Sequence, residues 1–319
     1  MQIFTRVEDF TQDPEKILLL GLGNFDGVHL GHRRLLGRAL EDAKRRGGKA
    51  GVFTFQEHPQ AVLHPQNRPQ LLTSPEQRLM LFREIGLAVC FFIPFTAEFS
   101  RIEPEDFVRD ILKKKLGVEK VFLGASARFG HGRRGDSKLM ARLADECGFE
   151  FEEIPPVEAG GGIVSSSRIR KLVQEGNLEE AGACLGRPFG LLGKVIEGAG
   201  RGKSLGYPTA NLEINAFQAL PPQGVYPVRV RVDGPWLSGV LNYGLRPTFK
   251  DGPAVPVLEV FILDFSGSLY GKTLEVLFYP RLRAEKAFQD AEALKTQIAQ
   301  DVETARNYFQ SNPLQEGRF

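Results

Sequence analysis

The sequence has 319 residues, which suggests two domains of about 150 residues, each long enough to bury a core of its own. Its composition, 42% hydrophobic and 25% charged, is that of a folded protein and excludes a wholly disordered or fibrous chain. The net charge is only +2 and the two signs are interspersed, so neither half carries the concentrated basic face that nucleic acid or an anionic membrane selects.

The apolar segments are too short to predict a membrane span. The longest, Leu87–Phe95, falls well below the about 20 residues that cross a bilayer. The first residues include Glu8 and Asp9 where a secretory signal would be basic and then apolar, so we expect a cytoplasmic protein. The three cysteines are far apart, unlike the pairs of zinc sites, and we expect them to be reduced. We expect small-molecule partners, with no nucleic acid and no membrane; the oligomeric state stays open.

The first half alternates strand-like and helix-like segments, which is typical of a parallel sheet covered by helices. Ser74, Pro75 and Gln77 have the pattern of an N-cap, a first-turn proline and a capping box. We therefore predict a Rossmann-like α/β domain. Its predicted strands are 17–20, 50–55, 87–93, 121–123 and 149–154. Its predicted helices are 31–46, 74–86, 105–116 and 137–147. Two more helices are predicted after the last strand: one begins within 164–170, and the other spans 178–185.

The pattern changes after Gly186. Short alternating strands, at 226–232, 258–264 and 274–279, are separated by glycine and proline clusters and predict a small antiparallel barrel or sandwich. Apolar residues then recur every three or four positions from Phe288 to Phe309, which predicts a C-terminal helix. The predicted domains are 1–186 and 187–319.

A glycine-rich segment, residues 23–32, separates the first predicted strand from the first predicted helix. This is where open α/β sheets bind ligands, and glycines there let backbone amides approach phosphate oxygens. His29 and His32 can face one pocket and donate hydrogen bonds to phosphates as pyrophosphate leaves. The glycine spacing is not that of a dinucleotide fingerprint. A glycine-rich turn with incidental histidines is the alternative.

The His-x-Gly-His signature resembles the nucleotidyltransferase superfamily, whose members attack the α-phosphate of ATP. Four segments in this order, 24–32, 54–59, 128–136 and 165–170, are similar to the adenylyltransferase half of the bacterial bifunctional riboflavin kinase/FAD synthetase family. The resemblance implies an FMN adenylyltransferase in which His29 and His32 are catalytic. It implies an ATP site formed by Gly23, Asn24, Phe25, His29, Gly31, His32, Ser166, Ser167 and Arg170, and a flavin site formed by Ser126, Arg128 and Phe129.

One departure from the family pattern concerns the flavin site. The family usually has Asp or Asn followed by Phe at the positions of Ser126 and Ala127. A hydroxyl and a methyl group then replace a carboxylate or carboxamide and an aromatic surface. We therefore expect weakened or altered flavin binding in the first domain.

A second glycine-rich stretch, residues 198–211, lies near the start of the second half. Pro208 stiffens its end and holds Thr209 and Asn211 on one side of an extended chain. A hydroxyl and an amide oxygen are hard ligands that suit Mg²⁺, which bridges ATP phosphates. The spacing is not that of a Walker loop, and a simple turn is the alternative.

This stretch resembles the metal and ATP motif of riboflavin kinase, the other half of the same family. The resemblance implies Mg²⁺ ligands Thr209 and Asn211 and a catalytic base at Glu259, although alternation along the predicted strand would turn Glu259 to solvent. It implies an ATP site formed by Gly198, Gly200, Gly202, Lys203, Thr209 and Asn211, and a flavin site formed by Arg283, Glu285 and Phe288.

The sequence thus predicts a multifunctional transferase. A C-terminal kinase would convert riboflavin and ATP to FMN and ADP, and an N-terminal nucleotidyltransferase would convert FMN and ATP to FAD and diphosphate, with Mg²⁺ as cofactor. The first alternative is riboflavin kinase activity alone, because of Ser126 and Ala127. The second is a barrel that binds protein or nucleic acid beside a nucleotidyltransferase with another product, against which the Thr209, Asn211 and Glu259 set argues.

Overall fold

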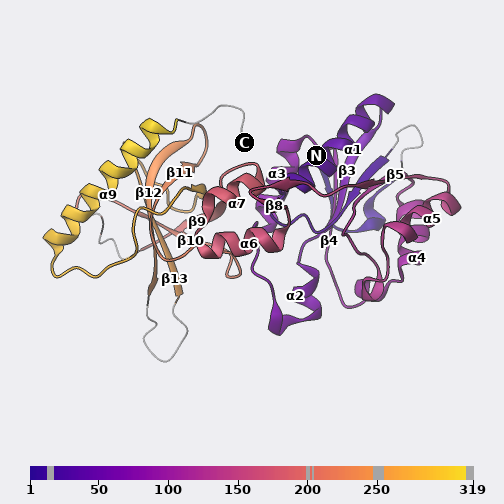
Figure 1. The fold of residues 1–319 in the computed structure, drawn as a ribbon, viewed down its shortest axis with the longest axis horizontal. Coiled ribbons are helices and arrows are strands. Elements are labelled where there is room, and N and C mark those ends of the chain that lie inside the picture. The colour runs from indigo at the N-terminus through magenta and orange to yellow at the C-terminus, as the bar shows by residue number, and fades with distance from the viewer. Residues whose placement is uncertain (13–17, 199–201, 203–204, 247–254, 314–319) are drawn as a thin grey trace. The chain divides into compact units, whose positions relative to one another are not determined.

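The computed structural model describes residues 1–12, 18–198, 202, 205–246 and 255–313 (Figure 1). The chain divides into two compact units, Met1–Ser166 and Ser167–Phe319. This division falls after the first residue of helix α6 (Ser166–Glu175) and before α7 (Leu178–Leu185), whereas the sequence analysis places the domain boundary after both helices. The boundary at residue 186 stays a prediction.

The first unit is built on a six-stranded sheet in which every neighbouring pair is parallel, in the order β1-β4-β3-β2-β5-β6. This confirms the predicted Rossmann-like architecture. The strands are β1 (Gln2–Phe4), β2 (Leu18–Leu22), β3 (Lys49–Phe55), β4 (Val89–Ile93), β5 (Val118–Gly124) and β6 (Glu150–Ile154). A two-stranded ribbon, β7 (Glu158–Ala159) with β8 (Gly162–Ile163), follows.

Helices cover both faces of this sheet, because successive strand residues point to opposite sides. Leu19 packs with α1 (Leu30–Arg46) and α3 (Pro75–Ile85) on one face, while Leu18 and Leu20 pack with η4 (Phe107–Lys115) and α5 (Ser137–Cys147) on the other. The shorter helices are η1 (Val7–Asp9), α2 (Pro59–Leu63), η2 (Pro65–Asn67), η3 (Phe99–Arg101), α4 (Pro104–Asp106) and η5 (His131–Arg133).

Two helix predictions can be compared in detail. Ser74 caps α3, its hydroxyl accepting a hydrogen bond from the amide of Gln77 at 3.2 Å, as predicted. The predicted helix 105–116 is present, but the prediction does not specify its winding: after α4 the chain continues as a π-helix, η4 (Phe107–Lys115). Apolar spacing indicates a helix but does not distinguish i→i+4 from i→i+5 hydrogen bonding.

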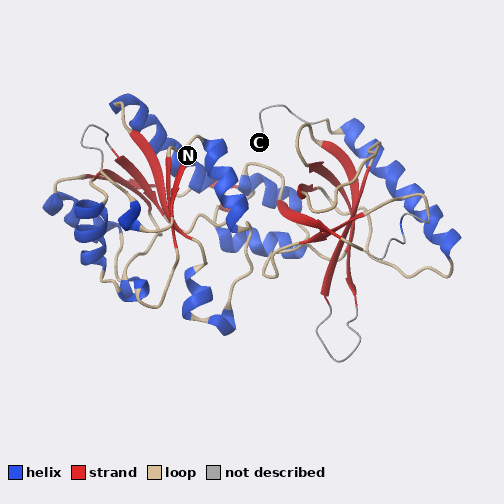
Figure 2. Cartoon of the chain, turned by 180° about the vertical axis from the view of Figure 1, so that it is seen from behind, coloured by secondary structure: helices blue, strands red, loops and turns tan. Residues whose placement is uncertain are grey.

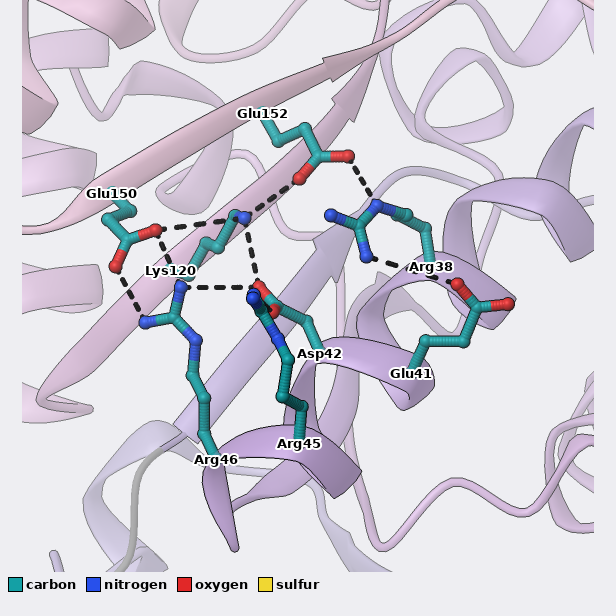
Figure 3. A network of polar contacts seen from close by, with 8 residues as sticks. All are labelled: Arg38, Glu41, Asp42, Arg45, Arg46, Lys120, Glu150 and Glu152. Carbon is teal, nitrogen blue, oxygen red and sulfur yellow. Dashed lines mark hydrogen bonds and ion pairs between the residues drawn. The ribbon is translucent and has the colours of Figure 1, made fainter.

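A network of charged side chains fastens the C-terminal half of α1 to β5 and β6 (Figure 3). Lys120 of β5, which is almost fully buried, contacts Asp42 of α1 at 2.9 Å and Glu152 of β6 at 2.8 Å. Arg46 makes two hydrogen bonds of 2.6 Å to Glu150. The other members are Arg38, Glu41 and Arg45, of which Arg45 also pairs with Asp42. Four cations thus balance four anions, which limits the cost of burying charge.

The second unit contains a closed antiparallel barrel with a long helix, α9 (Ala291–Ser311), on its outside (Figure 2). A barrel is therefore confirmed over a sandwich. The strand order is β10-β13-β12-β11-β14-β9, and β9 also pairs with β10, which closes the ring. The strands are β9 (Gly190–Ile196), β10 (Ala210–Glu213), β11 (Gly224–Arg231), β12 (Leu237–Arg246), β13 (Val255–Ile262) and β14 (Thr273–Phe278).

Helix α9 begins later than its apolar stripe predicts. Asp290 is the N-cap and accepts a hydrogen bond from the amide of Ala293 at 2.8 Å, so Phe288 precedes the helix. Ala305 and Phe309 are its buried apolar residues. Arg229 of β11 places its guanidinium carbon 4.1 Å from the centre of the Phe309 ring and so helps to hold α9 on the barrel.

Across the described ranges, no helix has both the length and the apolar character needed to cross a bilayer.

Candidate functional site

The first candidate loop, residues 23–29, follows β2, where the strand order of the sheet reverses. The chain runs from β2 to β3 and β4 on one side and then to β5 and β6 on the other. The loop after β5, residues 125–136, begins beside it because Leu22 is in register with Leu123. Ligands of open α/β sheets bind at such a switch point, so the topology brings both predicted loops of the first unit to the place expected for a ligand.

His29 and His32 form a closely packed pair at the start of α1. His29 is the N-cap, and its Nδ1 accepts a hydrogen bond from the amide of His32 at 3.3 Å. The two rings are stacked, with centroids 3.6 Å apart, and a Cβ at Gly31 would lie only 3.3 Å from the His29 ring. Because Nδ1 of His29 is an acceptor, its Nε2 carries the proton in the neutral ring and is the nitrogen that can donate.

The pKa of His32 is lowered well below its usual value, chiefly by burial and then by the charge of His29. Both causes disfavour the imidazolium ion, so His32 is neutral at pH 7. Phe25, held at φ 53°, places its ring 5.0 Å from the His32 ring. The site therefore presents a neutral imidazole beside the N-terminus of α1, a position that favours anions.

Asp26 holds the loop from inside the protein. Its buried carboxylate accepts hydrogen bonds from the amides of Leu72 and Thr73, both at 3.0 Å, and from the Thr73 hydroxyl at 3.1 Å. The Thr73 hydroxyl in turn accepts from the amide of Gly27 at 2.9 Å. Asp26 thus fixes the shape of the loop by joining it to the segment before α3.

The structure brings Ser166 to this loop and leaves Asn24 exposed. The Ser166 hydroxyl donates to the carbonyl of Asp26 at 2.8 Å. The carbonyl of Asn24 accepts from the Thr54 hydroxyl and from Arg78, each at 3.1 Å. Ser167 and Arg170, the other members of the predicted ATP site, lie on α6 in the second compact unit.

The predicted flavin residues of the first unit lie in the loop after β5. Phe129 is paired with Gly135 through two backbone hydrogen bonds of 3.0 and 2.9 Å, and a Cβ at Gly135 would lie 2.7 Å from the Phe129 ring. Ser126 and Arg128 are exposed, whereas Ala127 is half-buried against the core. The loop therefore exposes the hydroxyl of Ser126 and the guanidinium of Arg128 to solvent.

In the second unit, glycines lie directly against two predicted ATP and metal residues. A Cβ at Gly198 would lie 1.9 Å from Nδ2 of Asn211, and a Cβ at Gly202 would lie 2.3 Å from the carbonyl oxygen of Tyr207 and 3.1 Å from Oγ1 of Thr209. The chain can pass this closely only because these positions lack a side chain. Gly200 and Lys203 lie outside the described residues.

Glu259 lies on β13 between two asparagines. It is in register with Asn211 of β10 on one side and with Asn242 of β12 on the other, so the three side chains share one face. Leu258 and Val260, which point the other way, are buried. The shared face is the outer one, since Phe261, two residues on, packs in the cluster that includes Ala305 of α9. Glu259 is half-buried there.

The predicted flavin residues of the second unit follow β14. Glu285 lies against β12, where a Cβ at Gly244 would be 2.1 Å from its Oε1, on the face that Asn242 shares with Glu259. Arg283 instead pairs with Asp301 of α9 at 2.7 Å, and its guanidinium carbon lies 5.8 Å from the centre of the Phe288 ring. Asp301 thus connects the segment carrying all three residues to α9.

Sequence reasoning did not single out Asp26, Arg78, Asn242 or Asp301 as site residues. Arg78 had a detectable signal: with Leu81 and Phe82 it follows the i, i+3, i+4 spacing of the buried face of α3. The position of Asn242 opposite Glu259 depends on the strand register, which alternation alone does not fix.

Comparison with known proteins gives a consistent result for both units. The FAD synthetase family model matches residues 11–168, and the riboflavin kinase family model matches residues 185–309. A bifunctional riboflavin kinase/FMN adenylyltransferase from Listeria monocytogenes is 36% identical over 294 residues, covering 91% of this chain and 92% of the relative. The enzyme of that name from Escherichia coli (strain K12) is 34% identical over 310 residues, covering 97% and 98%.

A solved structure also matches nearly the whole chain. It is described as a macrolide-efflux protein from Streptococcus pneumoniae, is 29% identical, and covers 96% of this chain and 98% of that chain with a TM-score of 0.84. Efflux is the description of that protein alone, whereas both family models and the curated relatives concern flavin chemistry. With relatives above 30% identity over nearly its full length, the chain belongs to the family of bifunctional riboflavin kinase/FMN adenylyltransferases.

Proposed function

We propose that this chain makes both flavin cofactors, phosphorylating riboflavin in the second unit and adenylylating the FMN product in the first. The observation that carries the proposal is the presence of both family domains in one chain, each with a glycine-lined loop beside its predicted reactive residues. ATP, riboflavin and FMN are then the substrates, and FMN, FAD, ADP and diphosphate are the products.

In the first unit, a phosphate oxygen of FMN attacks the α-phosphorus of ATP, and the bond to the leaving diphosphate breaks. His29 and His32 hydrogen-bond the phosphates and stabilise the charge that collects on the leaving group. The loop Gly23–Phe25 and the hydroxyl of Ser166 line the ATP site. The family resemblance adds Ser167 and Arg170 as predicted ATP ligands. Ser126, Arg128 and Phe129 contact FMN.

In the second unit, Glu259 removes the proton of the terminal ribityl hydroxyl, which attacks the γ-phosphorus of ATP as ADP leaves. Thr209 and Asn211 bind the phosphates of ATP beside Gly198 and Gly202. Gly200 and Lys203 stay predicted ATP ligands from the sequence alone. Arg283, Glu285 and Phe288 surround the isoalloxazine ring. The register of Asn211 with Glu259, on neighbouring strands and one face, supports this arrangement.

The donor set in the second unit fits Mg²⁺. Thr209 and Asn211 offer hard oxygen atoms, a hydroxyl and an amide carbonyl. Mg²⁺ characteristically takes one or two protein oxygens and completes its shell with phosphate and water. When bound, the ion would neutralise charge on the transferred phosphoryl group.

Activity of the kinase alone is not favoured. The FAD synthetase family model extends across residues 11–168, which include the departures Ser126 and Ala127. These two residues affect the FMN contact and leave the histidine pair intact, so they concern affinity for FMN rather than the transfer step. We place the enzyme in the cytoplasm because both reactions use ATP.

One chromatographic experiment tests the function. The protein is incubated with riboflavin, excess ATP and Mg²⁺, and we expect FMN followed by FAD. FMN as the sole product would contradict the adenylyltransferase assignment. His29→Ala and His32→Ala variants should each stop FAD formation and still convert riboflavin to FMN.

A further inference from the structure

Arg78 of α3 has no role in the reactions proposed above, yet the residue is only 5% exposed. It donates to three backbone carbonyls: Nη1 to Asn24 at 3.1 Å and to Phe55 at 2.8 Å, and Nη2 to Gln56 at 2.6 Å. Every one of these acceptors is a main-chain oxygen. The Arg78 side chain therefore holds the backbone in place at these three residues.

The three carbonyls lie at one edge of the sheet. Asn24 is in the loop after β2, Phe55 is the last residue of β3 and Gln56 follows it. Strands β2 and β3 are neighbours, with Leu22 in register with Phe53. One planar guanidinium thus joins the carboxyl ends of two adjacent strands, a geometry that the single ammonium group of lysine would not reproduce.

Arg78 forms no ion pair with an Asp or Glu of the residues that the structure describes. Its guanidinium carbon lies 5.1 Å from the centre of the Phe92 ring, a cation–π contact. Burial lowers its pKa, and Asp26 is the leading charge that opposes this. A buried cation that is held by carbonyl dipoles and an aromatic ring, without a carboxylate, costs stability. Its field acts strongly on nearby charges because the surroundings exclude water.

The backbone hydrogen bonds of Arg78 and its buried charge both act on Asn24. Its carbonyl accepts from Arg78 and also from the hydroxyl of Thr54, which is fully buried. Two independent donors therefore fix the same peptide group, in the loop that leads to His29. A shift of that loop by about 1 Å would be enough to misplace groups aligned on a phosphate, at a cost of about 100-fold in rate.

We propose that Arg78 is a positioning residue for adenylyl transfer, which fixes the main chain at Asn24 and supplies a buried positive charge to the loop that carries Asn24 and His29. This inference rests on the proposed FMN adenylylation. Arg78 touches no substrate; it acts through the loop.

The test compares four variants in the full-length protein. Arg78→Met removes both charge and donors, Arg78→Lys keeps the charge, and Thr54→Val removes only the second donor to the Asn24 carbonyl. Arg83→Met is the matched control, an exposed arginine on the same helix. For each, kcat and KM for ATP in FMN adenylylation are measured per active site, titrated by a single-turnover burst of FAD, beside riboflavin phosphorylation by the same sample.

We expect Arg78→Met to lower kcat for adenylylation by about 100-fold, with a smaller rise in KM for ATP, because the loop is misaligned. Arg78→Lys should recover part of this loss, and Thr54→Val should lower kcat by about 3-fold, a small effect because one of two donors remains. Riboflavin phosphorylation and the Arg83→Met variant should match the parent.

The outcomes separate this inference from the proposed function. If the parent protein makes no FAD from FMN, the adenylyltransferase assignment fails and the role of Arg78 fails with it. If the parent makes FAD and both Arg78 variants match it within twofold per active site, only the role of Arg78 is overturned. Should Arg78→Met not fold, Arg78→Lys and Thr54→Val decide: normal kcat in both refutes positioning.

Discussion

The imidazole rings of His29 and His32 lie face to face, with centroids 3.6 Å apart and planes at 14° to each other. Two imidazolium ions would repel at this separation, and burial further lowers the pKa of His32. In the free protein we expect His32 to stay neutral as pH falls through 6.5, where an ordinary histidine titrates. An NMR titration of the ring protons, with His32→Ala for assignment, checks this; a His32 signal that titrates at or above 6.5 would contradict it.

Glu259 lies between Asn211 and Asn242 on one face of the barrel. Replacement by glutamine keeps the shape and removes the base, so Glu259→Gln should lower riboflavin phosphorylation by at least about 100-fold. FAD formation from added FMN should be unchanged, since it takes place in the other unit. Chromatography of both reactions provides the measurement, and unchanged phosphorylation would remove Glu259 from the mechanism.

At Gly202, the backbone carbonyl of Tyr207 occupies the space that a side chain would need. A Cβ there would lie 2.3 Å from the oxygen of Tyr207, which cannot move as a flexible side chain would. Gly202→Ala should therefore displace Thr209 and lower kcat/KM for riboflavin phosphorylation by about 10-fold or more. Gly37→Ala is the control, because a Cβ at Gly37 meets no atom within 4 Å and alanine favours a helix. Equal kinase activity in the two variants would show that the close approach at Gly202 has no effect.

The charge network on α1 makes the first unit sensitive to acid. Burial alone would raise the pKa of Asp42, but hydrogen bonds from Arg45 and Lys120 outweigh burial and hold the pKa well below its usual value. A hydrogen bond from Arg46 likewise lowers the pKa of Glu150. A lowered folded-state pKa adds stability that is present above the unfolded value, about 4, and is lost as pH falls below it.

Asp42→Asn should therefore lower the free energy of unfolding by about 3 kcal/mol at pH 7 and by less at pH 3. Thermal unfolding followed by circular dichroism measures the effect, and the single tryptophan, Trp236, reports separately on the second unit. Asp110→Asn breaks only the exposed pair with Lys114 and should leave the stability nearly unchanged, because solvent screens that pair. Equal stability of the two variants at pH 7 would refute the role of the network.

The architecture could be predicted from the sequence where local signals agree. The apolar runs of β2 to β5, the cap at Ser74 and the short strands of the second half are all indicated by the sequence pattern, and the apolar residues of these runs are buried in the structure. The π-helical winding of Phe107–Lys115 could not be predicted, because apolar spacing is nearly the same for both kinds of helix.

The candidate sites were predictable only in part, because their supporting contacts come from distant segments. Motifs gave His29, His32, Thr209, Asn211 and Glu259 as candidates, and their roles stay predictions. The contacts of Asp26 with Thr73, and of Arg78 with Asn24, join residues more than 40 positions apart. Pairings of this kind depend on the order of strands in the sheet, which local sequence does not encode.

Helix α1 has its histidine pair at one end and its charge network at the other, across 17 residues or about 25 Å of rise. The residues that stabilise the first unit and the residues proposed for catalysis thus lie at opposite ends of α1. Substitutions among Asp42, Lys120 and Glu150 could yield temperature-sensitive or heat-resistant enzymes whose nucleotide loop keeps its native sequence.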